Sequence, residues 1–375
     1  MRSEMILSLD LETFSSVNIE NGVYKYSESD DFQILLMSYA WNDGPVQTVS
    51  FLQGETIPDA VIAALYNESI EKHAFNASFE RVCLSRYLGL SRGEFIPAST
   101  NWWCTKVHAA MLGLPGSLKE VAKALDLSEQ KDEAGTLLIN YFCKPCKATK
   151  ANCGRTRNYP NHDPEKWDLF MKYNKQDVET ERAISHELFR QYPASEDALY
   201  QEKVNYWADQ QINDRGVLID LPMVNTIIDY NETMLAQLTQ RAKDITGLEN
   251  PNSMMQLKKW LHTQGVSADQ LTKATIPAIV AETGSADVKE VLGIRQQLGK
   301  TSVTKYERMR DAACQDSRVR GTLQFYGART GRWAGRIIQP QNLPQNHYEE
   351  IDELRKLVTK SNWQYLEMMY DNMIS

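Results

Sequence analysis

The sequence predicts an α/β domain in roughly the first 190 residues and a mainly helical region after it. Two observations support this division. Short β-like runs alternate with helical stretches as far as Tyr192, whereas long helical patterns with few strand signals begin near Ser195. The segment Tyr192-Pro193-Ala194-Ser195 lies at this change and marks the expected domain boundary.

The expected elements follow from local patterns. Residues 5–13 predict an apolar strand, and residues 34–41 and 46–52 predict a hairpin around an Asn42-Asp43-Gly44-Pro45 turn. Helical patterns cover residues 60–66, 77–87, 118–125 and 166–192. Beyond the boundary, two apolar stripes predict helices, one with Tyr200, Val204, Trp207 and Ile212, the other with Val224, Ile228, Leu235 and Leu238.

The composition is that of a globular protein with more than one core. The chain has 375 residues, of which 42% are hydrophobic and 24% charged. No apolar run is long enough to span a membrane, and the first residues, Met-Arg-Ser-Glu, lack the pattern of a signal peptide. Six scattered cysteines do not form a disulfide framework, so we expect a cytoplasmic protein without a membrane partner.

Basic residues are concentrated in two stretches of this acidic chain, whose net charge is −8. Residues 143–161 contain Lys144, Lys147, Lys150, Arg155 and Arg157 and no acid, and residues 295–336 carry a local net charge of +7. Such stretches are typical of contacts with a nucleic-acid backbone. The alternative is two solvated basic faces.

The most informative feature is the Asp10-Leu11-Glu12 triplet in the first strand. Residues i and i+2 of a strand point to the same face, so the two carboxylates would lie side by side. A hard divalent cation offsets their repulsion, because carboxylate oxygens suit Mg²⁺ or Mn²⁺. The alternative is an ordinary strand end with two solvated acids.

Two further acidic motifs follow. Asn76, a candidate N-cap, opens the helix that contains Phe79 and Glu80. Tyr173 and Asp177 are four residues apart in a later helix, so both side chains lie on one face.

The three motifs together, in this order, resemble a two-metal 3′–5′ exonuclease of the DEDD type with tyrosine. The chain resembles the proofreading domain of family A (DNA polymerase I-like) DNA polymerases, particularly phage-type enzymes. This resemblance implies a ribonuclease H-like mixed sheet with flanking helices, a role in DNA replication, and a phage or prophage gene expressed in a bacterial cell.

The resemblance also implies roles for individual residues. Asp10, Glu12, Glu80 and Asp177 would hold two Mg²⁺ or Mn²⁺ ions, and Tyr173 would position the attacking water. Thr13, Asn76 and Phe79 would contact the 3′-terminal nucleotide. Glu80 stands where the family usually has aspartate, and its extra methylene would shift metal placement and reduce activity.

The second half continues the resemblance. Residues 212–220, 252–257 and 300–306 resemble thumb segments of the same family. Thr330-Gly331-Arg332, followed by Gln341-Asn342-Leu343-Pro344, resembles the segment that joins thumb to palm and holds primer–template DNA. Arg332 and Arg336 can pair with phosphates, and Gly331 allows close backbone approach. Ala334 and Gly335 replace serines common in the family, which puts the local phosphate contacts in doubt.

The expected domains are therefore an exonuclease domain (residues 1–192), a helical thumb-like region (193–345) and the start of a palm (346–375). The palm carboxylates and the fingers helix would come after this point, so we expect no DNA synthesis by this chain alone. It could be a fragment, a truncated gene or half of a split polymerase whose other half is a partner.

Two functional hypotheses remain. The first is a 3′–5′ exonuclease acting on the single-stranded 3′ end of DNA. The second is a DNA-binding module or polymerase half with weak or no exonuclease activity. A zinc site at Cys143, Cys146, Cys153 and His162 is disfavoured, because the second pair of ligands is widely spaced; the basic loop there is expected to guide single-stranded DNA.

Overall fold

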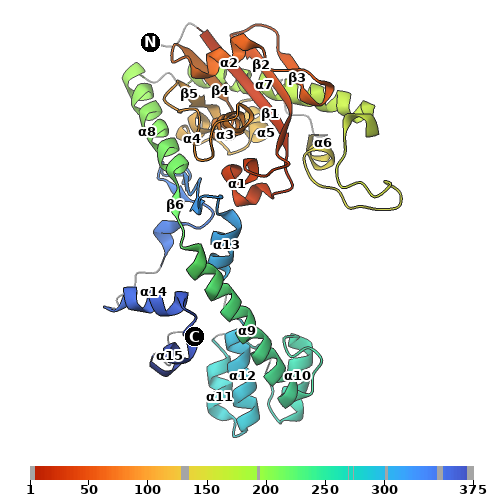
Figure 1. Cartoon of the computed structure of the whole chain (residues 1–375), viewed down its shortest axis with the longest axis vertical. Coiled ribbons are helices and arrows are strands. Elements are labelled where there is room, and N and C mark those ends of the chain that lie inside the picture. The colour runs from red at the N-terminus through yellow and green to blue at the C-terminus, as the bar shows by residue number, and fades with distance from the viewer. Residues whose placement is uncertain are drawn as a thin grey trace. The chain divides into compact units, whose positions relative to one another are not determined.

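The computed structural model describes residues 5–127, 135–191, 195–268, 270–272, 274–299, 303–343 and 349–369. It divides into two compact units. Unit 1 comprises residues 1–219 and 312–343, and unit 2 comprises residues 220–311 and 344–375. The units are described separately below (Figure 1).

Unit 1 is built on a mixed sheet, as the sequence predicted. Its five described strands have the order β3-β2-β1-β4-β5. The strand bounds are β1 (Met5–Phe14), β2 (Gln33–Trp41), β3 (Gln47–Ser50), β4 (Ile70–Ala74) and β5 (Trp102–Cys104). The β1–β2 and β2–β3 pairs are antiparallel, and the β1–β4 and β4–β5 pairs are parallel. The predicted hairpin is β2–β3, and its turn contains Asn42 in the left-handed region (φ 46°).

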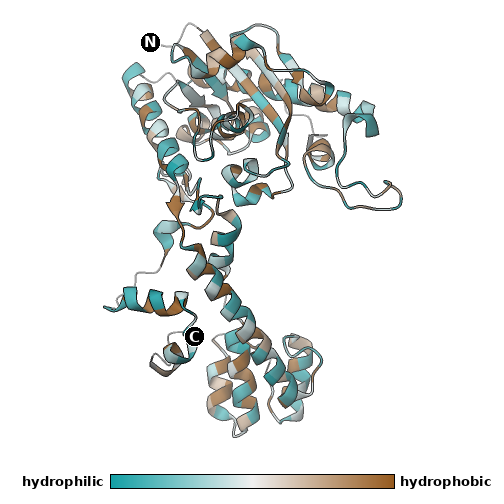
Figure 2. Ribbon diagram, viewed as in Figure 1, coloured by the Kyte–Doolittle hydropathy of each residue, from teal (hydrophilic) through white to brown (hydrophobic). Residues whose placement is uncertain are grey.

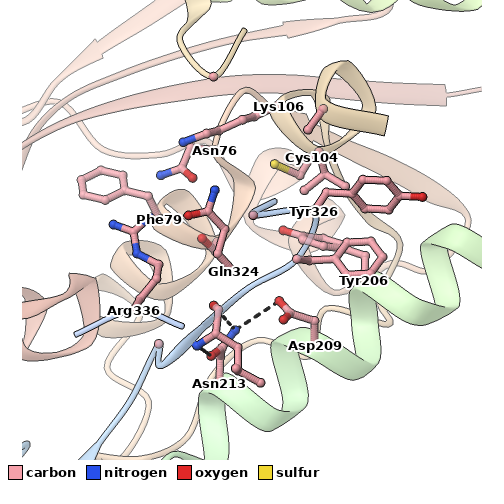
Figure 3. Close-up of a pocket in the computed structure, with 18 of the residues that line it drawn as sticks. Asn76, Phe79, Cys104, Lys106, Tyr206, Asp209, Asn213, Gln324, Tyr326 and Arg336 are labelled. Atoms are coloured by element: carbon pink, nitrogen blue, oxygen red, sulfur yellow. Dashed lines mark hydrogen bonds between the residues drawn. The ribbon is translucent and has the colours of Figure 1, made fainter. Parts of the chain in front are cut away.

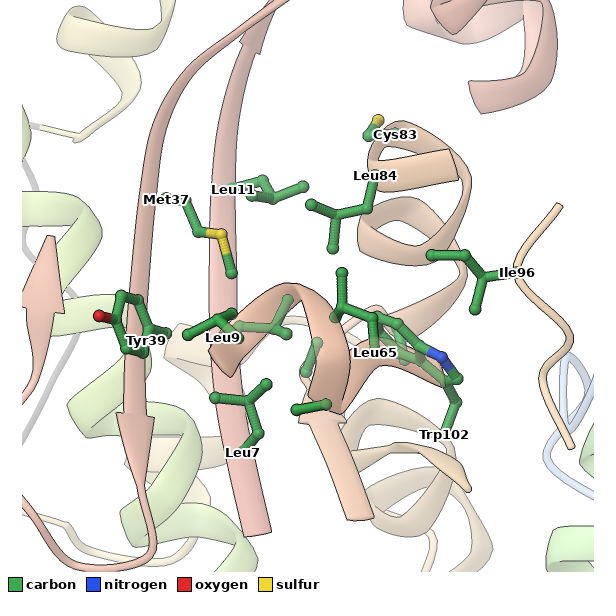
Figure 4. Close-up of a cluster of buried hydrophobic side chains, with 14 of the residues drawn as sticks. Leu7, Leu9, Leu11, Met37, Tyr39, Leu65, Cys83, Leu84, Ile96 and Trp102 are labelled. Atoms are coloured by element: carbon green, nitrogen blue, oxygen red, sulfur yellow. The ribbon is translucent and has the colours of Figure 1, made fainter. Parts of the chain in front are cut away.

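Helices cover both faces of this sheet. Their bounds are α1 (Val23–Ser27), α2 (Asp59–Tyr66), α3 (Ala77–Tyr87), α4 (Thr105–Met111), α5 (Leu118–Ala124), α6 (Gly135–Phe142), α7 (Pro164–Gln191) and α8 (Glu196–Arg215), with short 3₁₀ turns at Ile19–Asn21, Phe51–Gln53 and Pro160–His162. Strand residues Leu7, Leu9 and Leu11 pack toward α2 and α3 (Figure 4). Because side chains alternate along a strand, Asp10 and Glu12 face the other way.

A second core lies on the side of the sheet covered by α6 and α7. Phe14, Leu35 and Leu36 pack there against Phe142, Trp167, Phe170 and Tyr173. The Phe142 and Phe170 rings are stacked at 5.3 Å, and the Phe170 and Tyr173 rings at 6.2 Å. Such pairs add to the energy of apolar burial. Tyr173 is therefore the last member of a packed aromatic row.

Helix α8 docks on unit 1 through polar contacts. The buried Arg81 of α3 donates to Asp214 of α8 from both Nη atoms, at 2.9 and 2.7 Å. The Tyr24 hydroxyl donates to the same carboxylate at 2.7 Å. The buried positions of α8 are Tyr206, Asp209, Gln210 and Asn213, whereas Tyr200 and Ile212 of the predicted stripe are exposed. Hydrophilic colours predominate along α8 in Figure 2.

The C-terminal part of unit 1 is a series of short strands. These are β6 (Val217–Leu218), β7 (Arg318–Val319), β8 (Leu323–Gln324) and β9 (Ala334–Gly335), followed by the 3₁₀ turn Pro340–Asn342. β6 pairs with β7, and β8 pairs with β9. Asn213 of α8 connects to this series, because its side chain both donates to and accepts from the backbone of Leu323.

Unit 2 is helical where the structure describes it, as predicted for this region. Its helices are α9 (Leu221–Thr246), α10 (Met254–Thr263), α11 (Ile276–Glu282), α12 (Ala286–Leu298), α13 (Thr304–Ala312), α14 (Ile351–Thr359) and α15 (Trp363–Met369). Its core includes Leu257, Leu261, Val288 and Leu292. Tyr230 of α9 stacks on Trp363 of α15 at 4.0 Å.

The compact units differ from the predicted domain ranges. Helix α8 and residues 312–343 lie with the sheet, because Arg81–Asp214 and the β6–β7 pair connect them to it. The functional division at 192, 345 and 375 stays a prediction. Some residues of the predicted motifs and boundaries lie outside the described residues. These are 192–194, Lys300-Thr301-Ser302, Pro344 and 370–375.

A search of the described helices finds none with the length and apolar character needed to cross a membrane.

The Arg81–Asp214 contact predicts a large stability effect. Replacing Arg81 by Met should destabilise unit 1 by about 3–5 kcal/mol, because one partner of a buried pair is lost. Urea unfolding followed by tryptophan fluorescence measures this change. The matched control is Arg92→Met, whose pair with Asp30 is solvent-exposed at 3.6 Å and should change stability by about 0–1 kcal/mol. Equal effects of the two substitutions would contradict the docking role.

Candidate functional site

Strand β1 delivers the first two acids to the side of the sheet covered by α7. Asp10 pairs with Ser38 and Glu12 with Leu36 in the β1–β2 register, and the register shifts between Glu12 and Thr13. Bulges of this kind are common next to active sites, where they redirect side chains. Asp10 is half-buried and Glu12 is buried.

Helix α7 completes a carboxylate cluster. Asp177 lies on its buried face, and one ligand atom each from Asp10, Glu12 and Asp177 lie within 4.8 Å of one another. This is the single group with metal-ligand geometry among the residues the structure describes. Buried like charges at this spacing are costly unless a cation or a proton neutralises them. The predicted grouping of Asp10, Glu12 and Asp177 is therefore present.

Glu80 lies near the cluster but is not part of the 4.8 Å group. It is in the first turn of α3, is 3% exposed, and its Oε2 atom has no hydrogen-bond partner among the described residues. Burial, followed by the negative charge of Asp10, raises the pKa of Glu80 well above its usual value. A fourth carboxylate thus lies close enough to Asp10 and Glu12 for their charges to raise its pKa.

Tyr173 is fixed beside Asp177 by packing. Burial, followed by the charge of Asp177, raises the pKa of the Tyr173 hydroxyl, so it keeps its proton near neutral pH. Gly135 lies directly against the ring: a Cβ atom at that position would be 2.0 Å from Tyr173 Cε2. The absence of a side chain at Gly135 is required for the ring to occupy this place.

Two residues that contact the acids were not predicted from the sequence. Asn174 is fully buried, and its Nδ2 atom donates to Asp10 Oδ2 at 2.7 Å. The Cys143 thiol donates to Glu12 Oε2 at 3.6 Å, and burial, followed by the Glu12 charge, raises the pKa of this thiol. Asn174 follows Tyr173 in the sequence, but its orientation toward Asp10 depends on how α7 packs on β1.

The residues predicted to contact the 3′-terminal nucleotide lie in two places. Thr13 is buried, and its hydroxyl pairs with the Tyr26 hydroxyl at 2.8 Å. Asn76 occupies the N-cap position of α3 but makes no capping hydrogen bond from its side chain. Together with Phe79 it lines a cleft of about 620 Å³ that does not include the four acids (Figure 3).

The same cleft reaches the predicted primer–template segment. Gln324 and Arg336 line it close to Asn76 and Phe79 (Figure 3), and Arg336 Nη1 donates to Gln324 Oε1 at 2.8 Å. Thr330, Gly331 and Arg332 lie in the loop between β8 and β9.

The positions just after this loop are closely packed. Gln341 and Asn342 are exposed, but a Cβ atom on Gly335 would lie 1.9 Å from Gln341 Nε2. Glycine in place of the family's serine is therefore required by the position of Gln341. The contacts of Thr330, Gly331, Arg332, Arg336, Gln341 and Asn342 with DNA stay predictions.

The two basic stretches have different structural environments. The 295–336 stretch is divided between the two units, and Arg320 within it is buried and paired with Asp316 at 2.5 Å. Arg320 is therefore engaged in an internal ion pair. Cys146 donates to the Arg155 carbonyl at 3.5 Å and Cys153 is exposed. Neither cysteine is in the cluster with metal-ligand geometry.

Comparisons with known proteins give relatives for the whole chain. No protein-family model matches. The DNA polymerase of Bacillus phage SP02 is 49% identical over 367 residues, which cover 97% of this chain and 55% of that protein. The chain thus spans about half the length of this curated relative.

Solved structures also match. The polymerase domain of Pol1 from M. smegmatis, in complex with DNA primer-template and dNTP, has a TM-score of 0.52 at 14% identity, covering 92% of this chain and 53% of that one. The apo form of a nuclease has a TM-score of 0.33 at 13% identity, covering 56% of this chain and 82% of that one. The chain is therefore related along nearly its whole length to a phage DNA polymerase, which confirms its resemblance to the N-terminal part of a family A polymerase.

Proposed function

We propose that this chain is the 3′–5′ exonuclease part of a DNA polymerase, and that it removes 3′-terminal nucleotides from DNA by hydrolysis. The observation that carries the proposal is the gathering of Asp10, Glu12 and Asp177 within 4.8 Å on buried or half-buried positions. Ordinary surface acids do not meet in this way, because their repulsion is unopposed.

The donor set fits two hard divalent cations, Mg²⁺ or Mn²⁺. All the ligand atoms are carboxylate oxygens, and the buried Glu80 Oε2 has no hydrogen-bond partner among the described residues. Asp10, Glu12 and Asp177, with Glu80 at the margin, would hold the ions. When bound, such ions activate water and stabilise the charge that develops on the phosphate and the leaving 3′ oxygen.

The neighbouring side chains then have separate tasks. The Tyr173 hydroxyl, which keeps its proton, orients the attacking water by a hydrogen bond. Asn174 holds the Asp10 carboxylate in one orientation through its 2.7 Å hydrogen bond. The Cys143 thiol does the same for Glu12. Asp10 and Glu12 are thus oriented from the protein side.

A role in proofreading follows from the relative, which is a DNA polymerase. Its partners would be the single-stranded 3′ end and primer–template DNA. The remaining part of a polymerase would be a further partner. The helices of unit 2 would act as the thumb-like region. An enzyme with this arrangement would shorten a primer whose end is mispaired.

One observation favours a second function. Glu80 stands at the usual position of an aspartate and lies outside the 4.8 Å group, which is compatible with a DNA-binding module of weak exonuclease activity. The two functions differ in the product: the enzyme releases nucleotides, whereas the module retains DNA with an affinity that falls steeply with salt.

Removing two metal ligands should abolish the reaction. The double substitution Asp10→Ala/Glu12→Ala should lower the rate of nucleotide release from a 3′-labelled single strand to background in Mg²⁺ or Mn²⁺, because two ligands of the cation cluster are lost. The control is Asp59→Ala, an exposed acid at the start of α2, which packs on the face of the sheet opposite the carboxylate cluster. Equal hydrolysis by the wild type and the double variant would refute the enzyme hypothesis.

Tyr173 and Asp177 should have separable effects. Tyr173→Phe should lower the single-turnover rate by up to about 100-fold while leaving Mn²⁺ affinity unchanged, because it removes an orienting hydroxyl and no ligand. Asp177→Ala should lower the single-turnover rate and also weaken Mn²⁺ affinity. Gly135→Ala should resemble Tyr173→Phe, since its Cβ atom would displace the Tyr173 ring. Full activity in Tyr173→Phe would show that the tyrosine serves packing alone.

Asn174 should contribute through Asp10. Asn174→Ala should weaken Mn²⁺ binding or the rate by about 10–100-fold, the usual effect of losing a hydrogen bond to a metal ligand. Isothermal titration with Mn²⁺ and single-turnover hydrolysis measure the two effects. Gln176→Ala is a matched control two residues away on α7, and its side chain contacts Thr180 instead of an acid of the cluster. Equal Mn²⁺ affinity and equal rate in the two variants would show that Asn174 does not support the site.

A further inference from the structure

A basic groove lies on the loop between α6 and α7, outside the carboxylate cluster. Its volume is about 670 Å³, and its lining includes Arg155, Arg157, Tyr159, Asn161 and His162 but no acid. The loop is the long olive segment of Figure 1 that follows α6. The lining as described carries positive charge and no acid, which suits a ligand of opposite charge.

Internal hydrogen bonds hold the loop in this shape. Asn152 Nδ2 donates to the Lys147 carbonyl at 2.8 Å, and Asn158 Nδ2 donates to the Tyr141 carbonyl at 2.9 Å. The Cys146 amide donates to the Thr156 carbonyl at 2.8 Å. A groove that is already ordered loses little conformational entropy when a ligand binds.

Arg157 connects the groove to the strand that carries the acids. Its guanidinium lies 3.8 Å from the centre of the Phe14 ring, and its Nη2 atom donates to Gln33 Oε1 at 2.8 Å. Phe14 is two residues beyond Glu12, and Cys143 at the start of the loop contacts Glu12 itself. Both ends of the loop are therefore held beside the end of β1. The buried Nε atom of Arg157 has no hydrogen-bond partner among the described residues.

Tyr159 and His162 also line the groove, and the Arg157 guanidinium lies 5.0 Å from the centre of the Tyr159 ring. The Tyr159 side chain is 41% exposed, and its ring centre is 5.8 Å from that of His162. The Tyr159 amide donates to His162 Nδ1 at 2.9 Å, so the neutral imidazole carries its proton on Nε2. An exposed aromatic ring beside cationic and N–H donors is the usual arrangement for single-stranded nucleic acid.

We propose that this groove binds the single-stranded DNA on the 5′ side of the nucleotide being removed. Arg155, Arg157 and His162 contact its phosphates, and one base stacks on Tyr159. The inference rests on the proposed exonuclease function and adds a second binding site on the same substrate strand. The acids hold the 3′ end, and the groove holds the strand that leads to it.

The proposal predicts that substrate length matters. Thymidine 5′-(p-nitrophenyl phosphate) reaches the acids but is too short to reach the groove. A single-stranded oligothymidylate of about ten nucleotides, within the usual range of single-strand site sizes, reaches both. Groove substitutions should therefore affect the longer substrate alone.

The test compares Arg155→Ala/Tyr159→Ala with the wild type. Neither residue contacts an acid of the cluster, so hydrolysis of the thymidine ester should be unchanged. The KM for the oligothymidylate should rise at least about fivefold with kcat retained, because a stacked base and a phosphate contact are lost. The slope of log affinity against log salt should become shallower by about 1.

The matched control is Lys123→Ala, an exposed positive charge on α5. Helix α5 packs near Ile184 and Leu188, whereas the loop packs near Trp167 at the other end of the 28-residue α7. At 1.5 Å per residue, Trp167 and Ile184 are about 25 Å apart along the helix. Lys123→Ala should leave both KM values unchanged.

The outcomes separate the two proposals. If the wild type hydrolyses both substrates and the double variant matches it on the oligothymidylate, the groove does not bind the strand and the inference fails. If the wild type hydrolyses neither substrate, the exonuclease function itself fails. A KM that rises equally for the ester and the oligothymidylate would place the damage at the acids and overturn the groove assignment.

Discussion

The mutual repulsion of buried carboxylates is the constraint on which the rest of unit 1 depends. Asp10, Glu12 and Asp177 meet within 4.8 Å, and Glu80 approaches them from α3 with a pKa raised by burial and by Asp10. In the chain alone this arrangement is unfavourable, because each ionised group raises the cost of ionising the next. The arrangement persists only where well-packed elements on several sides fix the backbone. The free energy gained from packing must therefore offset the electrostatic repulsion within the site.

Those elements are arranged around β1. Leu7, Leu9 and Leu11 fix one face of the strand in the core with α2 and α3, while the aromatic row of Phe142, Phe170 and Tyr173 packs on the side covered by α7. Asn174 and Cys143 then orient the individual carboxylates. The same packing that stabilises the sheet therefore positions the reactive groups, and Gly135 shows how narrow the tolerance is beside the Tyr173 ring.

The resemblance to an exonuclease predicted the meeting of Asp10, Glu12 and Asp177, and β4 and β5 were not predicted. Local patterns in the sequence predicted β1, the β2–β3 hairpin and helices α2, α3, α5 and α7. These features depend on residue periodicity and on pairs close in sequence. Contacts that join distant segments were not predictable: Arg81 pairs with Asp214, 133 residues away, and Cys143 contacts Glu12, 131 residues away. The burial of polar residues along α8 was also missed: Asp209, Gln210 and Asn213 are buried, whereas Tyr200 and Ile212 of the predicted apolar stripe are exposed.

The two basic stretches differ in how their charges are placed in the structure. The stretch from 295 to 336 has the larger positive charge, yet it is divided between two units, and the buried Arg320 serves an internal pair with Asp316. The loop between α6 and α7 has fewer bases, but two of them, Arg155 and Arg157, line one groove without an acid, and Arg157 stacks on Phe14 of β1. Electrostatic attraction acts over about 10 Å in ordinary salt, so the charges that matter most to a strand at the carboxylates are those held nearest to them. If the chain is the exonuclease proposed above, the basic loop beside the acidic site would attract the DNA backbone that the acids alone would repel.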